Sequence, residues 1–455
     1  MSGIRRSATR DMTSGSIVKQ ILLFSVPLML GNIFQMLYNT VDVMVVGHFV
    51  SKEALAAVGS TTMIVNMLVF FFNGFAVGAG VIIGQHFGAR DMARLHDAVE
   101  TVIATTFVFC VLFTLLGLLG VRPMLKLMAT PEDVLADATT YLRIYFMGFS
   151  GLLIYNMVSG ILRAVGDTRH PLIFLIITSL LNIVLDLFFV IRLHAGIAGV
   201  AYATILSQFI SAGMTLTLLT RSRDIYRLVW RDLHIEPPIL RRIFAVGLPA
   251  GIQSVITAFS NVFVQSYVNA FGSSCMAGWS CYNKLDQFIM LPMQSMAMAS
   301  TTFVSQNIGA KQTARARRGT YTTVLMAFCI TGLIALSLFL FARPATRLFT
   351  NDASVIDFGA LFLRNNVLFL LFNCVSHVLA GSMRGMGDSK GPMAIMLASF
   401  VAIRQIYLFL VTRFVANTPT LVGFGYPVGW VSCCVIELIY FRTRWDRPDR
   451  LRAAE

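Results

Sequence analysis

A carboxylate inside an apolar run is the first feature of this chain that could carry chemistry. Asp42 lies in the second half of residues 25–46, SVPLMLGNIFQMLYNTVDVMVV, which otherwise have the pattern of one hydrophobic helix. At about 100° per residue, Asn32, Gln35, Asn39 and Asp42 fall within a sector of roughly 80°. A carboxylate near mid-bilayer costs about 2.5–3.5 kcal/mol to insert, so it usually faces a bundle interior and takes part in proton or ion movement. The pattern favours a helix face that takes part in proton or ion movement. The alternative is that Asp42 is a structural acid held by hydrogen bonds.

Further oxygen-bearing side chains occur in two later apolar segments. The motif LLNIVLDLFF places Asn182 and Asp186 four residues apart, on one face of a helix. Thr204, within AYATILSQ, adds a hydroxyl at a comparable predicted depth. Carboxylate, amide and hydroxyl oxygens can replace the water around Na⁺, and buried carboxylates also serve as proton relays. Together with Asp42 these residues predict a site for H⁺ or Na⁺, the alternative being mutual hydrogen bonding between three helices.

Composition assigns the chain to the polytopic membrane proteins. Of its 455 residues 56% are hydrophobic and only 13% are charged, unlike a soluble domain. Neither an HExxH motif nor a Walker A motif is present, so we expect neither an enzyme nor an ATP-driven pump, and no cofactor beyond a coupling H⁺ or Na⁺. The seven cysteines lie mostly in apolar spans without metal-binding spacing, which indicates small core residues.

The basic residues predict the topology. The net charge is +14, and most of the 36 basic residues fall in every second connection, beginning with the N-terminus and ending with the tail after Arg442. The positive-inside rule therefore predicts a multi-pass protein of the plasma (inner) membrane with both termini in the cytoplasm, and the charge needs no nucleic-acid partner. Twelve segments can each cross roughly 30 Å of hydrocarbon. They are 17–46, 54–84, 97–119, 138–160, 170–191, 196–219, 243–270, 276–306, 320–341, 357–382, 391–413 and 422–441.

An internal repeat organises these spans. At a shift of 221 residues, GQHFGARD matches SQNIGAKQ, and LRAVGDTRHP matches MRGMGDSKGP; one further residue of shift pairs Pro27 with Pro249. Six spans in each half make the repeats parallel, related by an axis along the membrane normal. We therefore predict an N-lobe over 1–219, a cytoplasmic linker over 220–242, and a C-lobe with a basic tail over 243–455.

The halves differ where chemistry is expected. Asp42 maps onto Val264, and at the shift of 221 the Asn182 and Asp186 positions map onto Ile403 and Tyr407. The intramembrane acid cluster is thus confined to the first half.

These features together resemble the multidrug and toxic compound extrusion (MATE) family, in particular its DinF-like bacterial branch. The resemblance covers essentially the whole chain and rests on the paired half-repeats, Pro27 with Asp42, the Asn182 and Asp186 pair, Thr204 and the two GD loops. It implies an all-α fold of twelve transmembrane helices in two six-helix lobes arranged as a V. It also implies a monomer that exports amphiphilic, often cationic small molecules by alternating access, against inward H⁺ or Na⁺. The cation site would be Asp42, Asn182, Asp186 and Thr204, with Pro27 at a bend of the first helix.

The C-lobe departs from one variant of the family. NorM-type members carry acids in the seventh and tenth helices, but this chain has none between Val246 and Ala270, and Asn373 stands at the matching tenth-helix position. A second cation site is therefore not expected there. Of the remaining C-half acids, Glu437 is expected to form a surface ion pair with the basic tail, and Asp286 is either structural or functional.

The substrate cavity is harder to predict. Candidate lining residues are Gln35, Tyr38, Asn39, Asn156, Gln208, Met290 and Met293. Unbranched thioethers can repack around different ligands, but ordinary helix packing explains the same methionines. The alternative function is a flippase for a lipid-linked precursor, which would need a cationic cavity; Arg404 is the main intramembrane base.

Overall fold

The computed structural model describes residues 9–128, 130–222 and 224–445, and every regular element within them is helical. Arg5, Arg6 and the arginines after Trp445, which the topology prediction used, lie outside these described residues. Eleven helical segments in the described part are long and apolar enough to cross a membrane. The remaining predicted span, 276–306, lies within the 37-residue helix α8 (Ser273–Gly309), which is long enough but more polar.

Contacts divide the described chain into two compact units. The first contains the residues up to Asp11 together with Val26–Gly247, and the second contains Met12–Ser25 together with the chain from Leu248 onward. The boundary therefore falls inside two long helices, α1 (Ile17–Phe49) and α7 (Pro237–Asn269). The N-terminal turns of α1 belong to the second unit, and the rest of α1 belongs to the first. In α7 this is reversed: its N-terminal turns belong to the first unit, and the rest belongs to the second.

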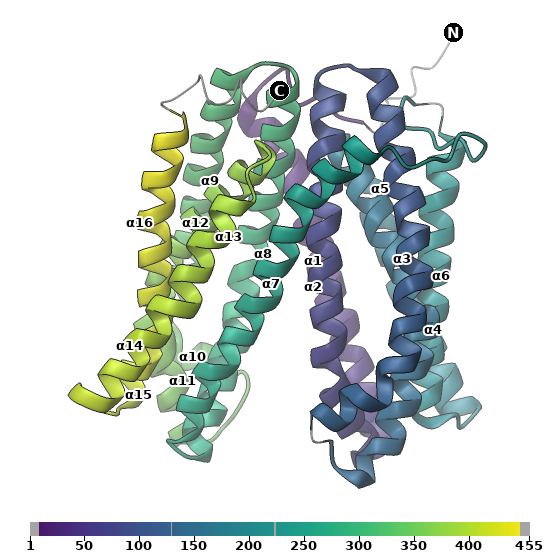
Figure 1. The fold of residues 1–455 in the computed structure, drawn as a ribbon. Coiled ribbons are helices and arrows are strands. Elements are labelled where there is room, and N and C mark those ends of the chain that lie inside the picture. Colours follow the sequence, from purple (N-terminus) through teal and green to yellow (C-terminus); the bar gives the residue numbers. More distant parts are fainter. Residues whose placement is uncertain (1–8, 129, 223, 446–455) are drawn as a thin grey trace. The chain divides into compact units, whose positions relative to one another are not determined.

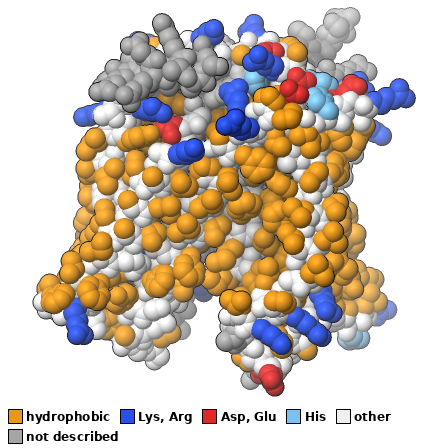
Figure 2. Space-filling model, viewed as in Figure 1, with side chains coloured by type: hydrophobic (Ala, Val, Ile, Leu, Met, Phe, Trp, Pro, Cys, Tyr) orange, Lys and Arg blue, Asp and Glu red, His pale blue; other side chains and the backbone are white. Residues whose placement is uncertain are grey.

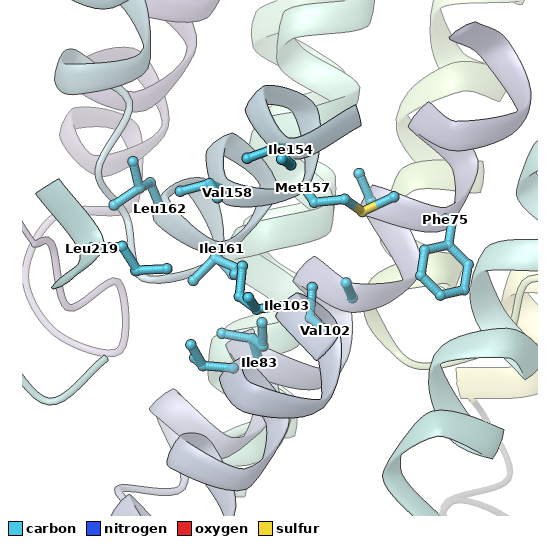
Figure 3. Close-up of a cluster of buried hydrophobic side chains, with 14 of the residues drawn as sticks. Phe75, Ile83, Val102, Ile103, Ile154, Met157, Val158, Ile161, Leu162 and Leu219 are labelled. Carbon is cyan, nitrogen blue, oxygen red and sulfur yellow. The ribbon is translucent and has the colours of Figure 1, made fainter. Parts of the chain in front are cut away.

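Helix α4 is the centre of the first unit, because it packs against α2, α3 and α6 (Figure 1). Figure 3 shows part of the core that these four helices share: Phe75 and Ile83 come from α2, Ile103 from α3 and Leu219 from α6. The elements of this unit, besides its parts of α1 and α7, are α2 (Lys52–Gly88), α3 (Met92–Leu127), α4 (Glu132–Ala164), α5 (Arg169–Leu187), the π-helical η1 (Phe188–Arg192) and α6 (Gly196–Arg221).

The second unit has α8 and α12 at its centre. Helix α8 packs against α9, α11 and α12, and α12 packs against α16. Its elements, besides its parts of α1 and α7, are α8, α9 (Thr313–Leu340), α10 (Ala342–Arg347), α11 (Ala353–Asn366), the 3₁₀ turn η2 (Val367–Phe369), α12 (Leu370–Gly385), α13 (Lys390–Leu397), the π-helical η3 (Ala398–Ile403), α14 (Arg404–Leu410), the π-helical η4 (Val411–Val415), α15 (Pro419–Gly423) and α16 (Gly425–Trp445).

One glutamine in each repeat accepts a hydrogen bond from the chain near the start of a half's first helix. In the first unit, Nη2 of Arg242, in α7, donates to Oε1 of Gln85 at 3.0 Å. In the second unit, the backbone N–H of Met12, just before α1, donates to Oε1 of the equivalent Gln306 at 2.9 Å. Arg315 adds bonds from Nη2 to the carbonyl oxygens of Ser14 and Gly15, at 3.0 and 2.9 Å. The repeated glutamine thus has the same structural role in both units.

The two GD loops form equivalent turns. Gly166 and Gly387 both adopt the left-handed conformation, with φ of +86° and +91°. A Cβ atom on Gly166 would also lie 2.4 Å from the carbonyl oxygen of Arg10, whose N–H donates to the carbonyl of Val165 at 3.1 Å. The turn therefore requires glycine for its backbone conformation and for the close approach of the N-terminal segment.

Side-chain polarity follows the helix axes. Figure 2 shows hydrophobic side chains along the lengths of the helices and most charged side chains near their ends. Many large apolar side chains are exposed on these lengths, among them Leu119, Leu333 and Ile439. In a soluble protein such a surface would be unstable, whereas in a bilayer it is the surface that meets lipid.

Replacing Gly166 by alanine should lower the thermal stability of the purified protein. The left-handed backbone costs a residue with a Cβ about 1–2 kcal/mol, and the contact with Arg10 adds to this cost. Gly213→Ala is the matched control, because nothing lies within 4 Å of a Cβ at Gly213. Thermal unfolding in detergent, followed by size-exclusion fluorescence, measures both. Equal melting temperatures for the two variants would contradict this account of the turn.

Candidate functional site

The two carboxyl groups predicted to act together meet in the first unit. Asp42 lies on α1 and Asp186 on α5, and their side chains interact directly. Asp186 is completely buried and Asp42 is half-buried. Both oxygens of Asp186 and Oδ1 of Asp42 have no hydrogen-bond donor among the described residues. As two carboxylates the pair has no donor between them, whereas one shared proton would supply it.

The other two predicted site residues are buried on the neighbouring helices. Asn182 lies one turn before Asp186 on α5, and neither its amide oxygen nor its amide nitrogen has a hydrogen-bond partner in the described structure. Thr204, on α6, donates its hydroxyl hydrogen to the carbonyl oxygen of Val200 at 3.0 Å, which leaves the oxygen able to accept or coordinate. Helices α5 and α6 pack together. The first unit thus holds an unsatisfied amide on α5 and a hydroxyl with spare acceptor capacity on α6.

Tyrosines lie beside the acid pair: Tyr38 was predicted as a cavity residue, whereas Tyr141 and Tyr145 were not predicted from the sequence. Tyr38 on α1 and Tyr141 on α4 lie close enough to Asp42 to interact electrostatically, and Tyr141 also reaches Asp186. The rings of Tyr141 and Tyr145 stack at 6.3 Å, and the Tyr145 hydroxyl bonds to the side chain of Gln208. The spacing of four between the two tyrosines was the available signal, since it places both on one face of α4. Their hydroxyls place polar groups close to the two carboxyl groups.

Helix α1 runs unbroken through Pro27. Pro27 is half-buried and stands two residues after Ser25, the last residue of the helix that packs with the second unit. Proline removes one backbone hydrogen bond and weakens the helix at that point. The weak point therefore coincides with the place where α1 changes its packing partner.

The predicted cavity residues fall into two groups. In the first unit, Gln35 and Asn39 are exposed, and Asn156 donates its side-chain amide to the carbonyl oxygen of Leu152 on its own helix, at 2.9 Å. In the second unit, Met293 is buried, and the amide of Asn373 lies 3.5 Å from Sδ of Met290. The methionines thus take part in packing α8 against α12.

A buried arginine stands in the second unit where the first has Asn182. The π-helical segment η3 adds one residue to its helix, so the shift of 221 before it becomes 222 after it. The equivalents of Asn182 and Asp186 are therefore Arg404 and Leu408, not the Ile403 and Tyr407 predicted from a constant shift. Arg404 donates to Oγ of Ser260 at 2.6 Å and to Oδ1 of Asn261 at 3.0 Å, and its guanidinium lies 5.1 Å from the centre of the Tyr426 ring.

Glu437 and Asp286, the two C-half acids singled out from the sequence, are both covered to different degrees in the second unit. The expected surface ion pair of Glu437 is wrong: Glu437 is completely buried in α16, beside Ser376 and Arg384 of α12. Its position near the basic tail was misleading, because packing against α12 decides which face of α16 is covered. Asp286 is half-buried next to Tyr282 and Tyr426, with Oδ1 lacking a partner in the described structure.

Comparison with known families decides the assignment. A model of the MatE family matches the chain twice, over residues 27–188 and 249–410. The chain belongs to the MatE family. The second match begins at Pro249, the repeat equivalent of Pro27, and the two matches end 222 residues apart, which agrees with the register after η3. Members of this family are transporters embedded in membranes, so the chain is a multi-pass MATE transporter.

Similar proteins cover nearly the full length of the chain. From Bacillus subtilis (strain 168), the "Probable multidrug resistance protein YpnP" is 29% identical, over 96% of this chain and 97% of the relative. The "Probable multidrug resistance protein YoeA" of the same organism is 26% identical, over 98% and 97%. A crystal structure of MATE in the bent conformation superposes with a TM-score of 0.91 at 23% identity, covering 97% of this chain and 98% of the other. The predicted all-helical, two-lobed MATE fold is confirmed.

Replacing Arg404 by methionine should destabilise the protein although it removes a charge from an apolar region. The substitution deletes the donors to Ser260 and Asn261, and each buried polar group left without a partner costs about 1–3 kcal/mol. Arg413→Met is the control, since Arg413 is exposed. Thermal unfolding in detergent should show a melting temperature lowered by several degrees for Arg404→Met only. A higher melting temperature for Arg404→Met would mean that the cost of burying the charge dominates.

Proposed function

We propose that this protein is a cation-coupled efflux antiporter that exports amphiphilic, often cationic small molecules by alternating access, in exchange for H⁺ or Na⁺. It would act as a monomer in the plasma (inner) membrane with both termini in the cytoplasm. The observation that carries the proposal is the contact between Asp42 and Asp186, two carboxyl groups that face one another without a donor.

The electrostatics of the pair support cation binding. Two carboxylates in contact repel each other strongly in an apolar region, so at least one must be neutralised, either by a proton or by a metal cation. A proton would complete the hydrogen bond between them. A Na⁺ ion would need several oxygen ligands, and the free amide oxygen of Asn182 and the hydroxyl of Thr204 are candidates beside the two carboxylates. We expect Asp42, Asn182, Asp186 and Thr204 to bind the coupling ion.

The path of α1 supports a link between this ion and a conformational change. Asp42 stands on the part of α1 that packs in the first unit, and the part before Val26 packs in the second. A change in the charge of Asp42 alters how favourably the surrounding part of α1 packs against its neighbours, and Pro27 supplies the place where the helix can bend. Cation binding could in this way bias the exchange between inward-open and outward-open states.

The substrate class is proposed from the relatives. The B. subtilis proteins that match over nearly their full lengths bear names for multidrug resistance, and the tyrosines beside the acid pair offer aromatic faces suited to cations. The flippase alternative has weaker support. The intramembrane base that it would use, Arg404, is already engaged by Ser260, Asn261 and Tyr426.

Neutralising either acid should abolish coupled efflux. Asp42→Asn and Asp186→Asn keep the size of the side chain and its hydrogen-bonding capacity but cannot titrate or carry the negative charge. We expect the rate of gradient-driven efflux of a fluorescent cation to fall about tenfold or more in proteoliposomes, in line with ordinary coupling free energies. Imposing a pH gradient and a Na⁺ gradient separately identifies the ion. Asp133→Asn, at an exposed acid in the first turn of α4, is the matched control.

Wild-type efflux by both Asn variants would show that the acid pair is structural only. A second comparison uses the mirrored position: Val264→Asp should not restore efflux to Asp42→Asn, because Leu408 provides no second acid in the second unit. Restored efflux would contradict the assignment of coupling to the first unit.

Pro27→Ala should weaken the response of α1 to the proton, because it restores the missing hydrogen bond and stiffens the helix. Spin labels at the exposed Leu37 on α1 and Leu206 on α6 report the movement. The distance between them should change with pH in the wild type, change less in Pro27→Ala and stay constant in Asp42→Asn. An equal response in all three would remove both residues from the mechanism.

A further inference from the structure

A second group of titratable side chains lies in the first unit, outside the acid pair. His96 and Glu100 are four residues apart on α3 and therefore share one face of that helix. Asp232 and His234 come from the segment between α6 and α7. Sequence patterns did not indicate this group, because its two parts are more than 130 residues apart and neither part alone has a metal-binding motif.

Glu100 is the centre of the group. Its Oε1 lies 2.7 Å from Nε2 of His96, and its Oε2 lies 2.9 Å from Nδ1 of His234. Ligand atoms of His96, Glu100 and Asp232 all lie within 4.8 Å of one another. One imidazole nitrogen and two carboxylate oxygens thus converge from a helix and a connecting segment.

The burial of Glu100 calls for a counter-charge. Its side chain is 0% exposed, and neither oxygen receives a hydrogen bond of good geometry from the described residues, although two imidazoles contact it. A buried carboxylate is costly unless it is paired or coordinates a cation. Asp232 brings a second negative charge to the same place and would increase this cost.

The surrounding structure holds the group in position. Val102 and Ile103, which follow Glu100 on α3, are fixed in the core of the first unit (Figure 3). The connecting segment is docked beside them: the N–H of Glu236 donates to Oγ1 of Thr101 at 3.0 Å, and the rings of Phe107 and Trp230 lie 6.0 Å apart. These two attachments hold the backbone that carries the ligating residues in position.

We propose that His96, Glu100 and Asp232 bind a divalent transition-metal ion of the Zn²⁺ class and thereby fasten the connecting segment to α3. Zinc accepts imidazole nitrogen and carboxylate oxygen at about 2.0–2.2 Å in a tetrahedral arrangement, and a water molecule would fill the fourth position. The two carboxylates balance the charge of the ion. Because one ligand is an imidazole nitrogen, the site suits Mg²⁺ and Ca²⁺ poorly, since these ions prefer oxygen ligands.

His234 is assigned a positioning role in this site. Its Nδ1 contacts the second oxygen of Glu100, and a partner of this kind orients a ligating carboxylate. Asp232 is exposed, so its side chain is free to close the site from the solvent side. The proposal is independent of the proposed transport function, because it concerns binding at a separate place in the first unit.

Metal binding to the full-length protein in detergent tests the proposal directly. The protein is purified with an affinity tag that contains no histidine, stripped with a chelator and titrated with Zn²⁺ in competition with a chromophoric chelator. We expect one tight site per chain, weakened at least tenfold in Asp232→Asn and in Glu100→Gln. His48→Ala and Asp133→Asn, at exposed residues elsewhere in the first unit, should bind like the wild type.

Asp232→Asn is the decisive variant, because the change is at an exposed position and should leave the fold intact even if Glu100→Gln does not. A second readout is tryptic cleavage after the exposed Arg231, next to Asp232. Zn²⁺ should slow this cleavage several-fold in the wild type and leave it unchanged in Asp232→Asn. Absence of a tight site in the wild type, equal affinity in Asp232→Asn, or equal protection in both proteins would overturn the proposal.

Discussion

Two carboxyl groups that touch inside an apolar helix bundle are the constraint on which the proposed activity depends. Both oxygens of Asp186 and Oδ1 of Asp42 lack a donor among the described residues, and we propose that a cation completes the pair. The cost of leaving like charges together in an apolar region is high, and a bound cation is the simplest way to remove it. Because Asp42 is on α1, this electrostatic cost affects the packing of a helix whose two ends belong to different units. In the proposed mechanism, the residue that binds the ion and the helix that bends therefore belong to the same element, α1.

The sequence predicted which face of a helix is polar better than it predicted which helices pack against each other. The stripe that contains Asp42, the Asn182 and Asp186 spacing and the parallel repeat could all be read from periodicity, and the carboxyl contact follows from two such faces meeting. Periodicity could not reveal that Tyr141 on α4 joins them, because it says which side of a helix is polar and not which helix lies opposite. Glu437 was expected at the surface because it stands next to the basic tail, whereas α12 covers it. The proximity of Glu100 and Asp232 depends on the path of the segment between α6 and α7. That segment has no helical or strand periodicity from which its path could be predicted.

The segment before α1 shows how a repeat can preserve a role without preserving a partner. Gln85 and Gln306 are equivalent in sequence, yet one accepts a bond from an arginine side chain and the other from a backbone N–H. What is shared is a hydrogen bond to the chain near the start of a half's first helix. Met12 is completely buried as a result, although it lies before the first hydrophobic span and carried no signal in the sequence.

The π-helical turn η3 has a consequence for how duplicated transporters diverge. A π turn accommodates one extra residue by widening a single turn, so the helix after η3 keeps its faces while its residue numbers advance by one. The second unit therefore carries Arg404 at the position of Asn182 and Leu408 at the position of Asp186, and the two halves differ in charge at equivalent places. An alignment that allows no gap inside a helix will pair the wrong residues throughout the segment that follows such a turn.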